Sequence, residues 1–117
     1  MRLLDIFKKN KTKDFSYIDS INKAKEEYNK GNLEKMYLLS QVFGGEDNEV
    51  NTIYVPLGVN KLKEEYDNMV VELVKEGKVK SFNCKPEYKG KSVIPSKITL
   101  ISSKDGVEVF KNTINIW

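Results

Sequence analysis

Residues 35–60 contain two strand-like runs that restrict the chain to a fold with both strands and helices. Residues 36–43 are almost entirely apolar, which is typical of a strand covered on both faces. Gly44-Gly45 follows and ends this run, and an acidic loop comes next. Residues 52–55 are β-branched or aromatic, as in a second strand. The region therefore predicts a pair of strands around a glycine turn.

Two helices are predicted on either side of this pair. The first covers residues 17–30, with Ser16 as its N-cap and Gly31 as its stop, because apolar residues recur at three- and four-residue steps. The second covers residues 61–76, with Asn60 as its N-cap and one apolar face. Both patterns indicate helices that pack one side on a core.

The C-terminal third predicts three more strands. Residues 79–88 mix strand formers with polar residues and contain Pro86, which favours a strand at the edge of a sheet. Asp105-Gly106 lies between two β-rich runs and predicts a hairpin. The expected fold is α+β, with a mainly antiparallel sheet of about five strands packed with two main helices and a short N-terminal helix.

The N-terminus is expected to form a unit of its own. Residues 1–14 combine four large apolar side chains with a lysine-rich stretch, which predicts a helical turn and a polar linker. A weak anchor for a membrane surface or a partner is the alternative. Residues 15–117 are expected to form one α+β domain, because 117 residues suffice for a single modest core.

The charge of the chain is close to balanced. Twenty Lys and Arg against 17 Asp and Glu leave a net charge of +3, which is weak evidence for a nucleic-acid partner. Six lysines in the last strands are candidates for a basic face: Lys78, Lys80, Lys85, Lys89, Lys91 and Lys97. The alternative is an ordinary solvated surface, so nucleic acid is not the expected partner.

The absence of histidine excludes several kinds of chemistry. The chain contains no His and one Cys, Cys84. Ser-His and Cys-His catalysis and His-ligated zinc are therefore excluded, as are cysteine-rich zinc sites. A lone Cys cannot form an intramolecular disulfide, which favours the cytoplasm. We expect no cofactor and no transmembrane span.

From residue 42 to about residue 100 the chain resembles the bacterial DNA/RNA non-specific endonucleases of the ββα-metal type. The resemblance is carried by an ordered series of short pieces: Leu38-Leu39, Phe43-Gly44-Gly45, Asn51, Val55-Pro56, Asn60, Glu76-Gly77, Tyr88-Lys89-Gly90 and Pro95-Ser96. It implies a nuclease-like core. Enzymes of this family use a histidine general base beside a Mg²⁺ that an asparagine holds.

The catalytic positions depart from that family. The resemblance places Tyr37 at the histidine, Glu34 at the family's aspartate and Asn60 at the metal-binding asparagine. Asp67 or Asn68 falls near the family's second acidic site. A tyrosine is mostly protonated at pH 7 and is a poor base. We therefore expect no catalysis, and Asn60 stays a weak candidate for a metal ligand beside its simpler role as a helix cap.

A second resemblance is to small histidine-free bacterial proteins that look like partners in toxin loci. It is carried by residues 43–47, Asn51-Thr52, residues 54–56, residues 87–92 and residues 94–97. It implies a stand-alone binding role, of which an immunity protein is one form.

Binding without catalysis is the function expected from these observations. Partner-binding candidates are the acids Glu46, Asp47 and Glu49 and the aromatic anchors Tyr37, Tyr54 and Tyr88, because interfaces combine charge complementarity with aromatic anchors. The alternatives are a solvated acidic loop and tyrosines of the core. An active or degenerate metal-dependent nuclease and a nucleic-acid-binding module are the competing functions.

Overall fold

The computed structural model describes residues 14–117, so the predicted N-terminal helix lies outside the described residues. In chain order the main elements are α2 (Ile21–Asn29), β1 (Leu33–Tyr37), β2 (Thr52–Pro56), α3 (Val59–Lys75), β3 (Ser81–Tyr88), β4 (Pro95–Lys104) and β5 (Val107–Asn115). The α+β class, the two main helices and the antiparallel pairing of the strands are confirmed.

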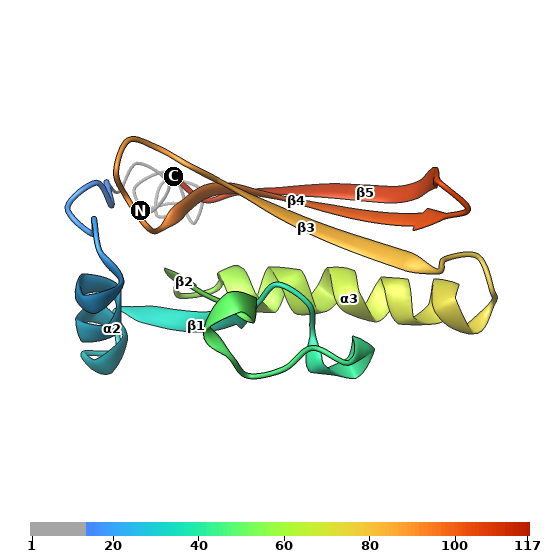
Figure 1. Ribbon diagram of the computed structural model, residues 1–117, viewed down its shortest axis with the longest axis horizontal. Coiled ribbons are helices and arrows are strands. Elements are labelled where there is room, and N and C mark those ends of the chain that lie inside the picture. The colour runs from blue at the N-terminus through green and yellow to red at the C-terminus, as the bar shows by residue number, and fades with distance from the viewer. Residues whose placement is uncertain (1–13) are drawn as a thin grey trace, which may run out of the picture.

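The prediction of one sheet of about five strands is wrong. β1 and β2 form a two-stranded sheet, and β3, β4 and β5 form a separate three-stranded sheet in that order. Figure 1 shows the three-stranded sheet above a second layer made by α3 and the β1–β2 pair. In the second layer, α3 packs beside β1–β2. After α3 the chain crosses to the other layer, where β3 begins a new sheet.

The core lies between these two layers. Its buried residues come from both sheets, from α3 and from the segments before β3 and after β5: Met36, Val55, Val59, Tyr66, Val70, Val79, Ile98, Leu100, Ile114 and Ile116. The hydroxyls of Tyr66 on α3 and Ser102 on β4 form a buried hydrogen bond of 2.7 Å. This bond satisfies two polar groups at the interface between the layers.

A smaller apolar cluster closes the end of the molecule near α2. Phe15, Ile18 and Ala24 pack there with Leu33 and Ile94. The cluster holds the chain before α2 against the turn that leads into β4.

Both boundaries of one predicted strand are corrected by the structure. The strand predicted over residues 36–43 is β1, which begins at Leu33 and ends at Tyr37, and Gln41–Phe43 form a 3-10 turn. Leu38 and Phe43 line the space beneath the other sheet and do not extend the strand.

Both predicted N-caps are wrong, whereas Gly31 follows the end of α2 with φ of 83°, as predicted. Ser20, not Ser16, caps α2 by accepting a hydrogen bond from the Lys23 amide. Gly58 precedes α3 with φ of 99°, and Asn60 lies inside the first turn of the helix. Glycine is suited to this positive φ, which other residues adopt at a cost.

The hairpin predicted at Asp105-Gly106 is confirmed. Both residues have positive φ, 53° and 80°, as the turn between two twisted antiparallel strands requires. β4 and β5 pair on either side of it.

Candidate functional site

The candidate site is the 38–51 loop, which connects β1 to β2, together with the strand β3 that lies above it. The loop contains two short 3-10 turns, Gln41–Phe43 and Glu49–Asn51. The ring of Phe43 in the loop stacks on Phe82 of β3, with 4.3 Å between centroids. The loop and β3 therefore form the two walls of one depression.

Asn51 holds the loop in shape. Its Oδ1 accepts a hydrogen bond of 2.8 Å from the Leu39 amide. Its Nδ2 donates to the carbonyls of Leu39 and Glu46, at 2.9 Å each. One side chain thus satisfies three backbone groups of a segment without regular structure, so the loop has a defined conformation.

Gly45 lies where the loop passes closest to itself. A Cβ at this position would lie 1.7 Å from the Leu39 carbonyl oxygen. We expect Gly45→Ala to lower the free energy of unfolding by about 1–3 kcal/mol, since a backbone atom has to move to make room. Urea denaturation measures this loss. An unchanged denaturation midpoint would show that the loop gives way freely and is not held by Asn51.

A buried polar cluster fastens the loop to α3. The Lys63 side chain is only 3% exposed, and its Nζ donates to Asp67 Oδ2 and to Ser40 Oγ, at 2.8 Å each. The Ser40 hydroxyl donates to the same Asp67 carboxylate. Since each side chain is bonded to the other two, we interpret the cluster as a structural tie.

This cluster is not among the site residues predicted from the sequence. The signal was present in the four-residue spacing of Lys63 and Asp67, which places them on adjacent turns of one helix face. Lys63 lies between the buried Val59 and Tyr66 on that helix. A helix can bury a lysine when a carboxylate one turn away pairs with it.

Tyr37 and Asn60, at the catalytic positions of the nuclease resemblance, border one depression of about 390 Å³ together with Asp67 and Asn68. Tyr37 lies near the end of β1, and the three others lie on the first half of α3. Partial burial and a hydrogen bond with Asp47 raise the pKa of Tyr37. The phenol therefore stays protonated at neutral pH and is an even poorer base than an ordinary tyrosine.

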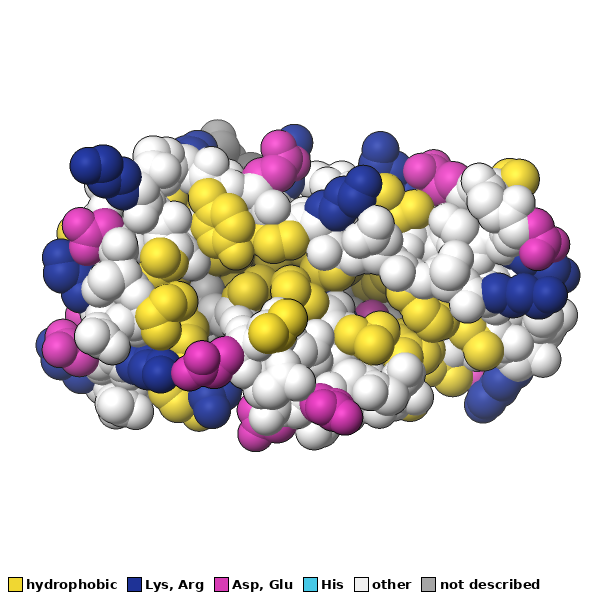
Figure 2. Space-filling model, in the orientation of Figure 1, with side chains coloured by type: hydrophobic (Ala, Val, Ile, Leu, Met, Phe, Trp, Pro, Cys, Tyr) yellow, Lys and Arg dark blue, Asp and Glu magenta, His cyan; other side chains and the backbone are white. Residues whose placement is uncertain are grey.

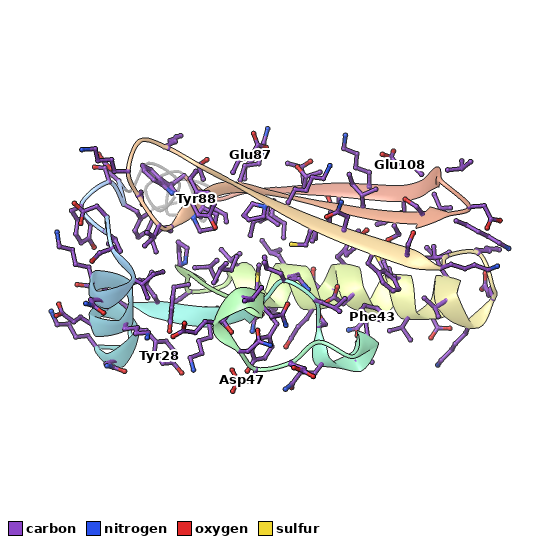
Figure 3. All side chains as sticks on the ribbon, in the orientation of Figure 1. Tyr28, Phe43, Asp47, Glu87, Tyr88 and Glu108 are labelled. Atoms are coloured by element: carbon purple, nitrogen blue, oxygen red, sulfur yellow. The ribbon has the colours of Figure 1, made fainter. Side chains whose placement is uncertain are left out.

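The acidic side chains of the loop are exposed to solvent. Glu46, Asp47 and Glu49 are all exposed, and the Glu49 side chain is 95% accessible. Figure 3 shows Asp47 at the outer end of the loop, on the side away from the three-stranded sheet. Lys25 Nζ lies 3.9 Å from Glu49 Oε1. Because both side chains are exposed to solvent, this ion pair is weak.

The remaining tyrosine candidates differ in exposure. Tyr54 is 8% exposed, and its ring centroid is 5.6 Å from that of Tyr28. Its side chain is therefore part of the core, which was the alternative to a partner-binding role for this tyrosine. Tyr88 is 47% exposed at the end of β3, so it is available to a partner. Partial burial of the ring raises the pKa of its hydroxyl.

Cys84 lies in β3 at the wall of the depression beside Lys63 and Asp67. Burial raises the pKa of its thiol to about 11. Because the thiolate is the reactive form, we expect alkylation by iodoacetamide at pH 8 to be about a hundredfold slower than for an exposed cysteine. Mass spectrometry against the urea-unfolded protein measures the ratio. Equal rates in the two states would contradict the burial of this thiol.

Three of the six lysines proposed for a basic face have an acidic or aromatic neighbour. Lys97 pairs with Glu87 at 3.3 Å, and Lys78 pairs with Glu76 at 2.8 Å. Lys89 lies over the Trp117 ring, 4.9 Å from its centroid. Figure 3 places Glu87 and Glu108 on the sheet that carries these lysines. The positive charge is therefore interrupted by acids.

Within 14–117 no group of three or more Cys, Asp or Glu side chains is arranged to hold a metal ion. None of the helices in this range is long and apolar enough to cross a membrane. No family model, no curated protein and no solved structure matches this chain.

Proposed function

We propose that the chain is a non-catalytic protein-binding domain that docks through the 38–51 loop and β3. The observation that carries the proposal is that three apolar side chains of the loop are open to solvent. Val50 is 90% exposed, Val42 66% and Leu39 37%. Figure 2 shows hydrophobic surface between the two layers. Open apolar side chains rimmed by polar ones are typical of docking surfaces.

An immunity-type inhibitor of a bacterial toxin is the form of this function that we favour. The resemblance to small partners of toxin loci supports it, and so does the acidic loop, which suits the basic surface of a nuclease. The cytoplasmic location favoured by the lone Cys84 belongs to the same proposal.

Co-purification with the product of the neighbouring gene tests the proposal. We expect a complex that survives size-exclusion chromatography and that Val50→Asp weakens by about thirtyfold or more, as loss of a central contact does. Leu62→Asp is the matched control, because Leu62 is 49% exposed on α3 and does not border the loop. Failure of the unmodified chain to bind would argue against the proposal.

A degenerate or active metal-dependent nuclease is the second candidate. The depression shared by Tyr37, Asn60, Asp67 and Asn68 favours it. Incubation of the purified protein with plasmid DNA and Mg²⁺ or Mn²⁺ decides between the two. Metal-dependent cleavage that Asn60→Ala abolishes would support the nuclease, and intact plasmid would support binding without catalysis.

A further inference from the structure

The edge of β3 is open along the same face as the proposed docking surface. The three-stranded sheet has the order β3-β4-β5, so β3 has a strand partner on one side only. Among residues 14–117, β3 forms its backbone–backbone hydrogen bonds with β4 alone. In an edge strand about half of the residues direct their N–H and C=O groups outward. Such an edge is a template for an additional strand.

Two depressions border β3 and meet at Leu38. One has a volume of about 190 Å³ and lies beside Phe82 and Cys84, where Phe43 of the loop stacks on Phe82. The other has a volume of about 390 Å³ and lies beside Tyr88, with Val50 on its far wall. Leu38 lines both. We call the combined feature the β3 trough, and β3 is its upper wall.

The length of the trough suits an extended peptide segment. At about 3.3 Å per residue, eight residues of β3 extend over about 26 Å. Successive side chains of an added strand point to opposite faces, so every second side chain would enter the trough. An α-helix uses its backbone groups in its own hydrogen bonds, so it cannot pair with the free edge of β3.

One acid lines the trough on the loop side. Glu49 borders the depression beside Tyr88, and its side chain is 95% accessible, while the trough is otherwise lined mainly by apolar residues. The partner segment should therefore combine apolar side chains with positive charge.

We propose that the β3 trough binds an extended segment of a partner protein, which adds as a strand to the free edge of β3. Alternate apolar side chains of the segment enter the two depressions, and a lysine or arginine of the segment faces Glu49. This inference rests on the proposed function and specifies that the partner is recognised as an extended strand. Pro86 has no N–H to donate, so backbone pairing is concentrated on residues 81–85.

Selection from a phage-displayed library of random twelve-residue peptides provides the probe. We expect the selected peptides to carry apolar residues at alternate positions and a net positive charge. The best peptide is then synthesised with N-methyl groups placed at one backbone position at a time. Strand addition predicts at least tenfold weaker binding for methylation at alternate residues and little change at the residues between them, because only every second N–H faces β3.

A charge variant tests Glu49 separately. Glu49→Gln should weaken peptide binding about threefold at low salt and less at high salt. The control Glu65→Gln removes the same charge from an exposed acid on α3 and should leave the affinity nearly unchanged.

The outcomes separate this inference from the proposed function. Selected peptides with helical spacing or net negative charge, uniform tolerance of N-methylation, or no selected peptide at all would each overturn strand addition. If the neighbouring gene product still binds in that case, the docking function stands and a folded surface is recognised instead. If neither peptide nor protein binds, both proposals fail.

Discussion

Replacing Asp67 by alanine is expected to lower the free energy of unfolding by about 3–5 kcal/mol, because it leaves the Lys63 ammonium without its carboxylate in a buried position. The Lys63 side chain is 3% exposed and that of Asp67 is 13% exposed. Water can therefore replace the lost partner only poorly. The Ser40 hydroxyl loses its acceptor in the same variant, which releases the 38–51 loop from α3. Chemical denaturation monitored by tryptophan fluorescence measures the loss.

A double variant distinguishes a lost ion pair from lost packing. Lys63→Met with Asp67→Ala should recover much of the stability, because the uncompensated charge is removed along with its partner. Glu64→Ala is the matched control on the same helix, since Glu64 is exposed. It should lower the free energy of unfolding by less than about 0.5 kcal/mol. A double variant as unstable as Asp67→Ala alone would show that the charge of Lys63 is not the cause.

Ile98→Ala is expected to lower the free energy of unfolding by about 2–5 kcal/mol, through lost burial and the cavity it leaves. Ile98 is fully buried in the middle of β4. It pairs with Pro86 on one side and Ile114 on the other. The cavity would therefore lie at the centre of the interface between the three-stranded sheet and the layer below. Thermal and urea denaturation measure the effect.

Ile101→Ala is the control in the same strand. Ile101 is partly exposed and stands outside the buried cluster to which Ile98 belongs. Successive side chains of a strand point to opposite faces of the sheet, so Ile101, three residues after Ile98, points to the other face. Ile101→Ala should therefore lower the free energy of unfolding by about 1 kcal/mol or less. Equal losses at the two positions would contradict a core confined to one face of the three-stranded sheet.

Local patterns predicted most of the elements but not their layering. The helix α3 and the Asp105-Gly106 hairpin follow from hydrophobic spacing and turn chemistry, which act within a few residues. The division into two sheets depends on which apolar faces meet across the core. That choice is made between residues far apart in the chain, and no short pattern encodes it.

The candidate site shows the same division. Tyr37 and Asn60 were selected by resemblance, and the structure places them around one depression with Asp67. Tyr54 and Tyr88 were both candidate anchors, yet Tyr54 is buried and Tyr88 is half exposed. The sequence alone did not separate them, because both lie in strands and only the opposite layer decides which ring is covered.

The sequence by itself determined that no imidazole chemistry is available to this protein, since the chain contains no histidine. It also determined the order of helices and strands, because backbone preferences and hydrophobic period are local properties. Only the tertiary structure decided that Lys63 is buried with Asp67 and Ser40 and that the edge of β3 is open above the loop. Both features arise from contacts between segments distant in sequence, whose free energy depends on how the two layers pack.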